Sequence, residues 1–326
     1  MNEIKLDYSD VCFKDNGKLK LLIIVGTRPE IIRLAAVIEK CRKYFDCILA
    51  HTGQNYDYNL NGIFFKDLKL SDPEVYMNAV GDDLGATVGN IINCSYKLMA
   101  QTKPDALLIL GDTNSCLSAI SAKRLHIPIF HMEAGNRCFD ECLPEETNRR
   151  IVDIISDVNM CYSEHARRYL ADCGLPKERT YVTGSPMAEV LHSNLEKIKA
   201  SDIHARLGLE KGKYILLSAH REENIDTEKN FLSLFTAINK MAEKYDMPIL
   251  YSCHPRSRNR LAASGFELDP RVIRHEPLGF HDYNCLQMNA FAVVSDSGTL
   301  PEESSFFTSI GKPFPAVCIR TSTERP

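Results

Sequence analysis

The sequence contains no long hydrophobic run and no excess of charge of one sign. No apolar stretch approaches the roughly 20 residues that a helix needs to span a bilayer, and the first residues show no apolar signal-peptide segment. The net charge of -4 and the pI near 6.2 supply no overall attraction to nucleic acid or to anionic lipid. We therefore expect a cytoplasmic protein without a membrane or nucleic-acid partner.

The 12 cysteines lack the spacing of a metal site or a redox pair, because no CxxC occurs among them. Cys138 and Cys142 are the closest two, and no matching cluster of histidine and cysteine completes a zinc site around them. Scattered cysteines of this kind are typical of reduced thiols. We expect no metal ion.

Length and composition predict a folded chain of two domains. The 326 residues allow two domains of ordinary size, and a hydrophobic fraction of 44% with a charged fraction of 25% is typical of a globular protein. Short apolar, β-rich runs alternate with helix-like stretches in both halves, which predicts an α/β fold with buried parallel sheets. The runs are 21–25, 47–51, 106–110, 127–131, 158–162 and 180–183, then 214–219, 248–253, 272–275, 292–295 and 316–319.

A turn separates the two series of runs. Residues 183–186 read Thr-Gly-Ser-Pro, and the polar, helix-like stretch up to Gly212 is typical of a segment that crosses from one domain to the next. We place the boundary near Pro186, which predicts an N-terminal domain over 1–186 and a C-terminal domain over 187–326. Residues 1–18 precede the first strand and are predicted to be an extension that carries no chemistry.

The first strand runs into Gly26-Thr27-Arg28-Pro29-Glu30, and a helix follows. A glycine, a helix N-terminus and Arg28 together favour a bound anion. Neither the GxGxxG of a dehydrogenase nor the GxxxxGK of a P-loop is present, which argues against nucleotide hydride chemistry and against ATP hydrolysis. The alternative is an ordinary strand-to-helix turn with a surface arginine.

Two junctions in the second half have the character of a nucleotide site. Residues 295–299 form a turn of mostly small residues, which exposes backbone N–H groups to a phosphate, and Glu303 in the next helix suits ribose hydroxyls. His220 follows another strand with an arginine beside it, and its imidazole can bind a diphosphate or titrate near neutrality. The alternatives are a helix cap at Ser297 or Thr299 and a structural histidine.

Three acids lie where chemistry is expected. Asp112 follows the run 106–110, Glu133 follows the run that starts at residue 127, and Glu145 lies on the loop beyond. The carboxyl ends of parallel strands border the ligand crevice of an open sheet, so these side chains suit proton transfer. Strand-end acids also cap helices or pair with arginines, and Arg149 is placed to neutralise Glu145, so both interpretations stand.

Eight short motifs occur in order, and together they resemble the non-hydrolysing UDP-N-acetylhexosamine 2-epimerases from about Leu21 to the last residue. The motifs are Gly-Thr-Arg-Pro-Glu at 26–30, Thr-Gly-Gln at 52–54, Gly-Asp-Thr at 111–113, Glu-Ala-Gly at 133–135, Pro-Glu-Glu at 144–146, His-Arg-Glu-Glu-Asn at 220–224, Ser-Asp-Ser-Gly at 295–298 and Thr-Glu-Arg-Pro at 323–326. The resemblance implies two Rossmann-like domains facing a cleft, the glycosyltransferase B architecture, with UDP held mainly by the second domain.

The resemblance also implies a reaction without a cofactor. UDP is eliminated to give a 2-acetamidoglycal and is re-added after a proton returns to the opposite face, which needs two differently placed acid/base groups. Asp112, Glu133 and Glu145 match the catalytic acids of the family, and His220 matches the histidine near the diphosphate. The substrate-binding positions are matched by Arg28, Arg33, Leu278, Tyr283, Ser297, Gly298, Thr299, Glu303 and Arg325, with Glu303 at the ribose and residues 278 and 283 at the uracil side. The family leads us to expect a homodimer.

Three residues depart from the family pattern. Arg33 stands where many members have lysine, Asn55 where histidine is common, and Thr299 where the phosphate turn has a second glycine. The stretch 131–140 is more similar to the branch that converts UDP-2-acetamido-2,6-dideoxy-L-talose to UDP-N-acetyl-L-fucosamine for capsule or O-antigen, and we favour that branch over UDP-GlcNAc. Relatives continue beyond the position of Pro326 with a final helical segment, which we expect this chain to lack.

Three other functions fit the same motifs. A hydrolysing epimerase and a glycosyltransferase use the same architecture, and both would release free UDP. A nucleotide-sugar-binding module without activity would bind UDP and turn nothing over. Solvent deuterium at the acetamido-bearing carbon is expected of the non-hydrolysing epimerase, and free UDP that accumulates stoichiometrically would favour a hydrolysing epimerase or a glycosyltransferase.

Overall fold

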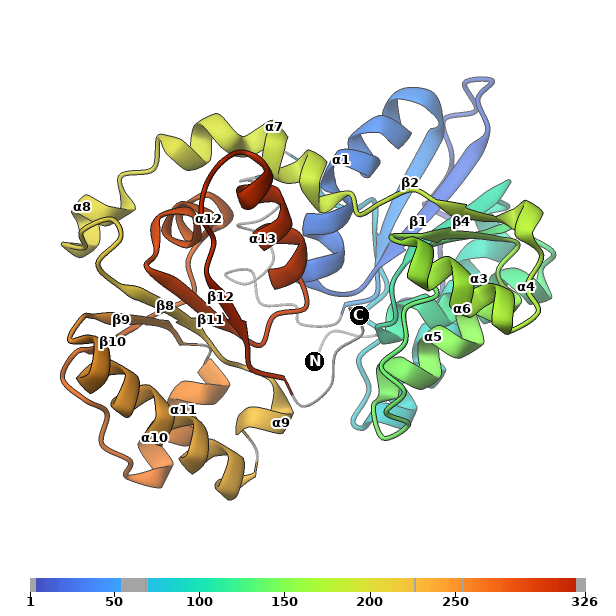
Figure 1. Cartoon of the computed structure of the whole chain (residues 1–326). Helices are drawn as coiled ribbons and strands as arrows, with labels where there is room; N and C mark the ends of the chain where they lie inside the picture. The colour runs from blue at the N-terminus through green and yellow to red at the C-terminus, as the bar shows by residue number, and fades with distance from the viewer. Residues whose placement is uncertain (1–3, 54–67, 69, 226, 254, 321–326) are drawn as a thin grey trace. The chain divides into compact units, whose positions relative to one another are not determined.

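The computed structural model describes residues 4–53, 68, 70–225, 227–253 and 255–320. It divides the chain into two compact units, the first ending at Val190 and the second beginning at Leu191. Each unit is an α/β structure built on one parallel sheet, and helix α7 (Met187–Lys199) starts in the first unit and ends in the second (Figure 1). The predicted fold class, α/β with two Rossmann-like sheets, is confirmed.

The first sheet has seven strands in the order β3-β2-β1-β4-β5-β6-β7, and every pairing is parallel. The strands are β1 (Lys20–Val25), β2 (Asp46–His51), β3 (Val75–Tyr76), β4 (Ala106–Leu110), β5 (Ile129–Ala134), β6 (Val158–Cys161) and β7 (Thr180–Val182). Six of them coincide with apolar runs of the sequence. The analysis missed β3, because two residues are too short to show a pattern.

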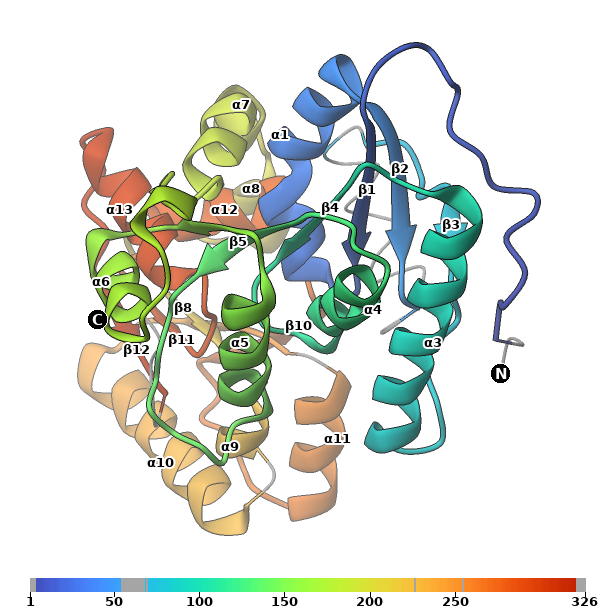
Figure 2. The same ribbon diagram turned by 90° about the vertical axis from the view of Figure 1, so that its right-hand side faces the viewer.

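Helices cover both faces of this sheet, which explains why its strands are apolar without alternation. Helix α1 (Arg28–Tyr44) packs Ile31 and Leu34 on one face, against Ile23 of β1. Helices α3 (Leu84–Thr102), α4 (Ser118–Arg124) and α5 (Pro144–Ile155) cover the opposite face (Figure 2). The remaining helical segments are η1 (Asn114–Leu117), α6 (Glu164–Asp172) and η2 (Lys177–Arg179).

The N-terminal extension belongs to the first core. Tyr8 is fully buried and Phe13 is nearly so, and both pack in the cluster that contains Leu22 of β1 and Leu98 of α3. The Tyr8 N–H donates to the Gln101 side chain at 2.6 Å, and the Tyr8 hydroxyl donates to the Lys5 carbonyl at 2.6 Å. The extension therefore stabilises the sheet on the α3 side.

The second sheet has five parallel strands in the order β10-β9-β8-β11-β12. The strands are β8 (Ile215–Ser218), β9 (Ile249–Ser252), β10 (Val272–His275), β11 (Ala292–Ser295) and β12 (Ala316–Cys318). Helices α9 (Glu222–Ile225), α10 (Glu228–Tyr245) and α11 (Pro255–Ser264) pack on one face, where Phe235 contacts Tyr251. The other helices are α8 (Ile203–Leu207), α12 (Phe280–Asn289) and α13 (Leu300–Ser309).

Strand order identifies one position in each sheet where a ligand is expected. In the first sheet the chain moves outward from β1 to β3 and then returns to β4 on the other side of β1. In the second it moves from β8 to β10 and returns to β11 beside β8. Ligands of open parallel sheets bind at the carboxyl ends of such strand pairs, because the loops there run in opposite directions. Asp112, His220 and Ser297 lie on the loops after such strands, and Glu133 lies near the end of β5.

Replacing Tyr8 tests whether the extension is part of the first core. Tyr8→Ala is expected to lower the free energy of unfolding of the first unit by about 3–5 kcal/mol, because a buried aromatic ring is lost. Tyr8→Phe removes only the hydrogen bond to Lys5 and is expected to cost about 1 kcal/mol. Urea denaturation measures both changes. The control is Leu6→Ala at an exposed position, and a Tyr8→Ala effect no larger than that control contradicts the assignment.

Candidate active site

Glu133 lies at a strained position at the end of β5. It has φ +64, and the pairing of β5 with β6 shifts register between Met132 and Ala134, as in a β-bulge. A left-handed backbone is unfavourable for a glutamate, and bulges near functional sites re-aim a side chain. The side chain is only 4% exposed and pairs with the Arg33 guanidinium at 2.5 Å. Glu133 is therefore inside the strand, not after it as the sequence predicted.

The Glu133 carboxylate lies against the turn that carries Asp112. Gly111 has φ +73, and a Cβ added to it would be 3.3 Å from Glu133 Oε2. Both the backbone angle and the close approach require glycine. The structure thus brings two of the three predicted acids to neighbouring strand ends, β4 and β5.

Asp112 is held by helix α5. Its carboxylate pairs with the Arg149 guanidinium through Nε at 3.2 Å and through a second, shorter contact, and its carbonyl accepts from Asn148 at 2.9 Å. The Arg149 Nη1 also donates to Glu146 at 2.8 Å, and Glu146 is almost fully buried. The Asp112 side chain keeps 20% of its surface exposed, so it is oriented and still accessible.

Glu145 begins α5 rather than lying on a loop. Pro144 occupies the first turn of that helix, a position that proline favours, and the helix starts there. Glu145 shares a helix face with Asn148 and Arg149, which hold Asp112. Arg149 pairs with Asp112 and Glu146, so the alternative in which Arg149 neutralises Glu145 is wrong. Among the described residues Glu145 has no ion pair.

The turn after β1 already holds an anion, which is the side chain of Glu30. The Glu30 carboxylate is buried and accepts from the Gly26 N–H at 3.1 Å and the Thr27 hydroxyl at 2.7 Å. It also accepts from Thr113 at 3.0 Å and Ser115 at 2.5 Å, which ties the β1 and β4 turns together. The sequence analysis expected an external anion in this turn. Burial raises the pKa of Glu30, against the lowering effect of its four donors.

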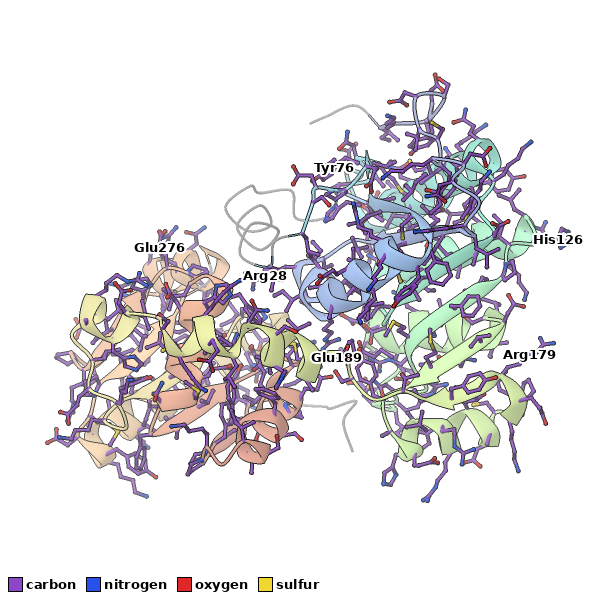
Figure 3. The ribbon with its side chains drawn as sticks, turned by 90° about the horizontal axis from the view of Figure 1, so that it is seen from above. Arg28, Tyr76, His126, Arg179, Glu189 and Glu276 are labelled. Atoms are coloured by element: carbon purple, nitrogen blue, oxygen red, sulfur yellow. The ribbon has the colours of Figure 1, made fainter. Side chains whose placement is uncertain are left out.

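Arg28 is half-buried at the start of α1. Figure 3 shows it on the side of the first unit opposite to His126 and Arg179, which lie before the strands β5 and β7. Arg28 is therefore at the carboxyl edge of the sheet, with Asp112 and Glu133. The expectation that it lies beside the candidate site is consistent with this position.

In the second unit Asp296, directly after β11, organises the turn that carries His220. The Asp296 carboxylate is fully buried and accepts from the His220 N–H at 2.8 Å, the Arg221 N–H at 2.9 Å and the Asn224 amide at 3.0 Å. Its other oxygen lies 3.0 Å from Nδ1 of His220. An acid in this position fixes the orientation of the imidazole. The His220 side chain is 39% exposed.

A hydrogen-bond network joins the turn after β11 to α12. The Ser297 hydroxyl is 2.9 Å from the Thr299 hydroxyl, which donates to Glu303 Oε1 at 2.9 Å. Gln287 donates to Glu303 Oε2 at 2.8 Å. The carboxylate of Glu303 is thus oriented from both sides and is nearly buried. Thr299 does not cap α13 with its side chain, so the capping alternative for it is wrong.

Tyr283 lies beside the same network. Burial and the negative charge of Glu303 raise the pKa of its hydroxyl, which places it close to that carboxylate. Leu278 is half-buried in the loop between β10 and α12, and Gly298 lies in the turn before α13. Arg325 lies outside the described residues, so its predicted contact with phosphate stays a prediction.

Several residues of the site had no role in the sequence analysis. Asp296 and Glu30 each lie inside a motif, and strand-end placement was the available signal for them. Gln287 and Arg149 come from helices, where their partners depend on how the helix packs.

No group of three or more His, Cys, Asp or Glu in the described part of the chain is arranged to hold a metal ion. No helix within those same residues has the length and apolar character to cross a bilayer.

The pKa of Asp296 gives a test of its role. Burial alone would raise this pKa, but the hydrogen bond and charge of His220, with further donors from Arg221 and Asn224, lower it to about 2. A lowered pKa means that ionised Asp296 stabilises the folded state at neutral pH by about 2 kcal/mol, and that this stabilisation is lost as the pH falls from about 4 to about 2. Asp296→Asn is expected to be less stable than the wild type at pH 7 by at least that amount.

Urea denaturation between pH 2 and 7 compares the two proteins. The gap in unfolding free energy between wild type and Asp296→Asn is expected to narrow only below about pH 4. A gap that stays constant down to pH 2 contradicts the role of the charge. Glu196→Gln, at a carboxylate in an exposed pair with Lys199, is the control for a general acid effect.

Known proteins match almost the whole chain. A family model described as UDP-N-acetylglucosamine 2-epimerase matches residues 39–326. UDP-N-acetylglucosamine 2-epimerase of Methanococcus maripaludis is 34% identical over 317 residues, which cover 94% of this chain and 84% of that protein.

Solved structures agree with this match. UDP-N-acetylglucosamine 2-epimerase from Rickettsia bellii is 45% identical with a TM-score of 0.86, covering 95% of this chain and 81% of that one. Methanocaldococcus jannaschii UDP-GlcNAc 2-epimerase, solved in complex with UDP-GlcNAc and UDP, is 32% identical with a TM-score of 0.87, covering 94% of this chain and 86% of that one. Sequence and fold agree, and the chain belongs to the UDP-N-acetylglucosamine 2-epimerase family.

Proposed function

We propose that the protein is a non-hydrolysing UDP-N-acetylhexosamine 2-epimerase, and the observation that carries the proposal is the pair of acids at the ends of β4 and β5. The proton on the acetamido-bearing carbon is weakly acidic, so its removal is coupled to departure of UDP. A 2-acetamidoglycal forms, a proton returns to the opposite face, and UDP adds again. Atoms and electrons balance without a redox step, since only a C–H and a C–O bond break and re-form.

Inversion requires one acid on each face of the sugar carbon. Asp112 and Glu133 come from adjacent strands, and each is oriented by its own arginine, Arg149 and Arg33. Separately oriented carboxylates meet the geometric requirement of general acid and base catalysis. We assign proton transfer to these two residues, and a supporting role to Glu145, which shares a helix face with the residues that hold Asp112.

The departing UDP needs cationic and hydrogen-bonding groups, which the second unit offers. His220 Nδ1 lies 3.0 Å from the buried Asp296 carboxylate, which orients the imidazole, and we propose that the ring contacts the diphosphate and stabilises the charge that develops on the leaving group. We propose that the turn 297–299 contacts phosphate, and that Glu303 accepts from the ribose hydroxyls. Arg325 is proposed as a further phosphate contact, and residues 278 and 283 as the uracil side.

The finer substrate assignment rests on the stretch 131–140. Its similarity to the branch acting on UDP-2-acetamido-2,6-dideoxy-L-talose supports that sugar as the substrate, with UDP-N-acetyl-L-fucosamine as product and a place in surface polysaccharide synthesis. UDP-GlcNAc is the competing substrate, because the related proteins are named for it. NMR with both UDP-sugars side by side decides between them.

A homodimer is the proposed assembly, and light scattering of the purified protein measures it.

Proton exchange with solvent tests the reaction itself. In deuterated water the wild type is expected to place deuterium at the acetamido-bearing carbon, and NMR follows the exchange. Glu133→Gln and Asp112→Asn are each expected to slow it by about 100-fold or more, because a proton-transfer group is lost. Glu164→Gln, at an exposed pair on α6, is the control and keeps the wild-type rate.

Supplying each epimer separately sharpens this test. If the two acids serve opposite faces, each variant loses elimination of UDP from one epimer and keeps part of it from the other. Product without deuterium contradicts the proposal. Stoichiometric release of free UDP would identify a hydrolysing epimerase or a glycosyltransferase, and tight UDP binding without exchange would identify a binding module.

Nucleotide binding tests the assignment of Glu303. Glu303→Gln is expected to weaken UDP binding by about 10- to 100-fold, the loss expected for hydrogen bonds to a charged acceptor. Binding of a dideoxy-UDP without ribose hydroxyls is expected to be weak in the wild type and unchanged by the substitution. Titration calorimetry measures the binding of both nucleotides. Glu133→Gln is the matched control, because Glu133 is assigned to proton transfer and not to nucleotide binding. An equal loss for both nucleotides contradicts a ribose contact.

A further inference from the structure

His131 is a fully buried histidine that connects the two turns carrying Asp112 and Glu133. It lies on β5, and its Nε2 is 2.9 Å from the carbonyl oxygen of Gly111, the residue before Asp112. Its Nδ1 is 3.1 Å from Asp153 Oδ1 on α5, and Asp153 is also fully buried. Neither the motifs nor the proposed chemistry gives this histidine a role.

The two partners of the ring are both acceptors. A carbonyl and a carboxylate have no proton to offer, and a neutral imidazole carries a single N–H. A neutral His131 would therefore point a lone pair at one of these oxygens in a buried site, which is unfavourable. An imidazolium suits both, because it donates to the Gly111 carbonyl and places its positive charge 3.1 Å from Asp153 Oδ1. Burial opposes this charge, but the hydrogen bond and charge of Asp153 and the Gly111 carbonyl outweigh it, so the pKa of His131 is raised.

Asp153 extends the connection to the turn after β5. Its carboxylate accepts from the Gly135 N–H at 3.1 Å, and its second oxygen pairs with Arg137 at 2.6 Å. The Arg137 guanidinium also donates to the Asn136 carbonyl at 2.6 Å. One ring and one carboxylate thus hold the backbone on both sides of the two acids, at Gly111 and at Gly135.

We propose that His131 is a positioning residue, a buried imidazolium that fixes the spacing between the Asp112 and Glu133 carboxylates and thereby sets the rate of proton transfer. The proposal rests on the proposed epimerase function. His131 touches no substrate and acts through the Gly111 carbonyl and through Asp153. Small displacements of reacting groups matter here, because an error of about 1 Å in placement is able to cost about 100-fold in rate.

The charges around the ring are consistent with a cation there. Asp153 faces it from α5, Glu133 acts on it from its own strand, and Arg137 lies on the far side of Asp153. Arg33 pairs with Glu133, and Arg137 with Asp153. Burial raises the pKa of the nearby Cys116 thiol, which keeps it neutral. A raised pKa means that His131 is an imidazolium, in contact with Gly111 and Asp153, below about pH 6.5. This charged form is lost as the pH rises through the folded-state pKa of His131.

Two substitutions test the two contacts of the His131 ring separately. His131→Gln offers a donor toward Gly111 but none toward Asp153, and His131→Asn offers one toward Asp153 but none toward Gly111. Each is expected to lower kcat by about 10- to 100-fold, with KM and the UDP dissociation constant within about 3-fold of the wild type. Near-UV circular dichroism and amide hydrogen exchange of β4 and β5 measure how much of the first unit is folded, so kcat is expressed per molecule with a folded first unit. His165→Gln, at an exposed histidine on α6, is the control.

A structural role alone predicts a different result. In that case the variants have a lower melting temperature and fewer molecules with a folded first unit, while kcat per such molecule stays at the wild-type value. That outcome overturns the proposal. In the wild type, kcat is expected to change as the pH rises through the folded-state pKa of His131, and a lower kcat in the variants together with the loss of this change supports the proposal.

A second measurement needs no substrate. Nitrogen NMR of labelled histidine in the wild-type protein is expected to show both ring nitrogens of His131 protonated at pH 7, because both face oxygens that have no proton to offer. One unprotonated ring nitrogen at pH 7 overturns the proposal. If the wild type fails to turn over a UDP-sugar, the proposed function fails and this measurement still reports on the imidazolium.

Discussion

A carboxylate placed at the end of a buried strand needs a compensating partner, and this requirement organises both candidate sites. Transfer of a charge from water into a protein is costly unless cations or several donors surround it. The first unit meets the requirement with arginines. Arg33 pairs with Glu133, Arg149 with Asp112 and Arg137 with Asp153. The second unit instead surrounds Asp296 with backbone N–H groups and an amide. Each acid is thereby fixed in direction before any ligand binds.

The strands could be predicted from sequence, because a strand covered on both faces is apolar along its length. Eleven runs identified in this way coincide with strands, and the acids after β4 and near the end of β5 followed from them. The bulge at Glu133 could not be predicted. It depends on how β5 pairs with β6, and no local residue pattern encodes a register shift.

The partners of the acids could not be predicted from the sequence either. Arg149 had Glu145, Glu146 and Asp112 within reach, and only the packing of α5 against the β4 turn decides among them. The same holds for Thr299, which the sequence places in a phosphate turn. Its hydroxyl donates to Glu303, a bond that the glycine common at this position in the family has no group to make. In this chain the Thr299 hydroxyl orients the Glu303 carboxylate, and the Thr299 N–H donates to the Ser297 hydroxyl at 3.3 Å.

Glu30 occupies the position in the first unit where the sequence predicted an external anion. The turn after β1 has the glycine and helix start that favour a phosphate, but the Glu30 carboxylate already accepts the Gly26 N–H there. A phosphate would have to displace a buried acid that four donors hold. In the second unit Asp296 occupies the turn after β8 in the same way, because it accepts the His220 and Arg221 N–H groups. Each of these turns is therefore ordered by a buried acid of the chain itself, and a phosphate that binds nearby must use other donors.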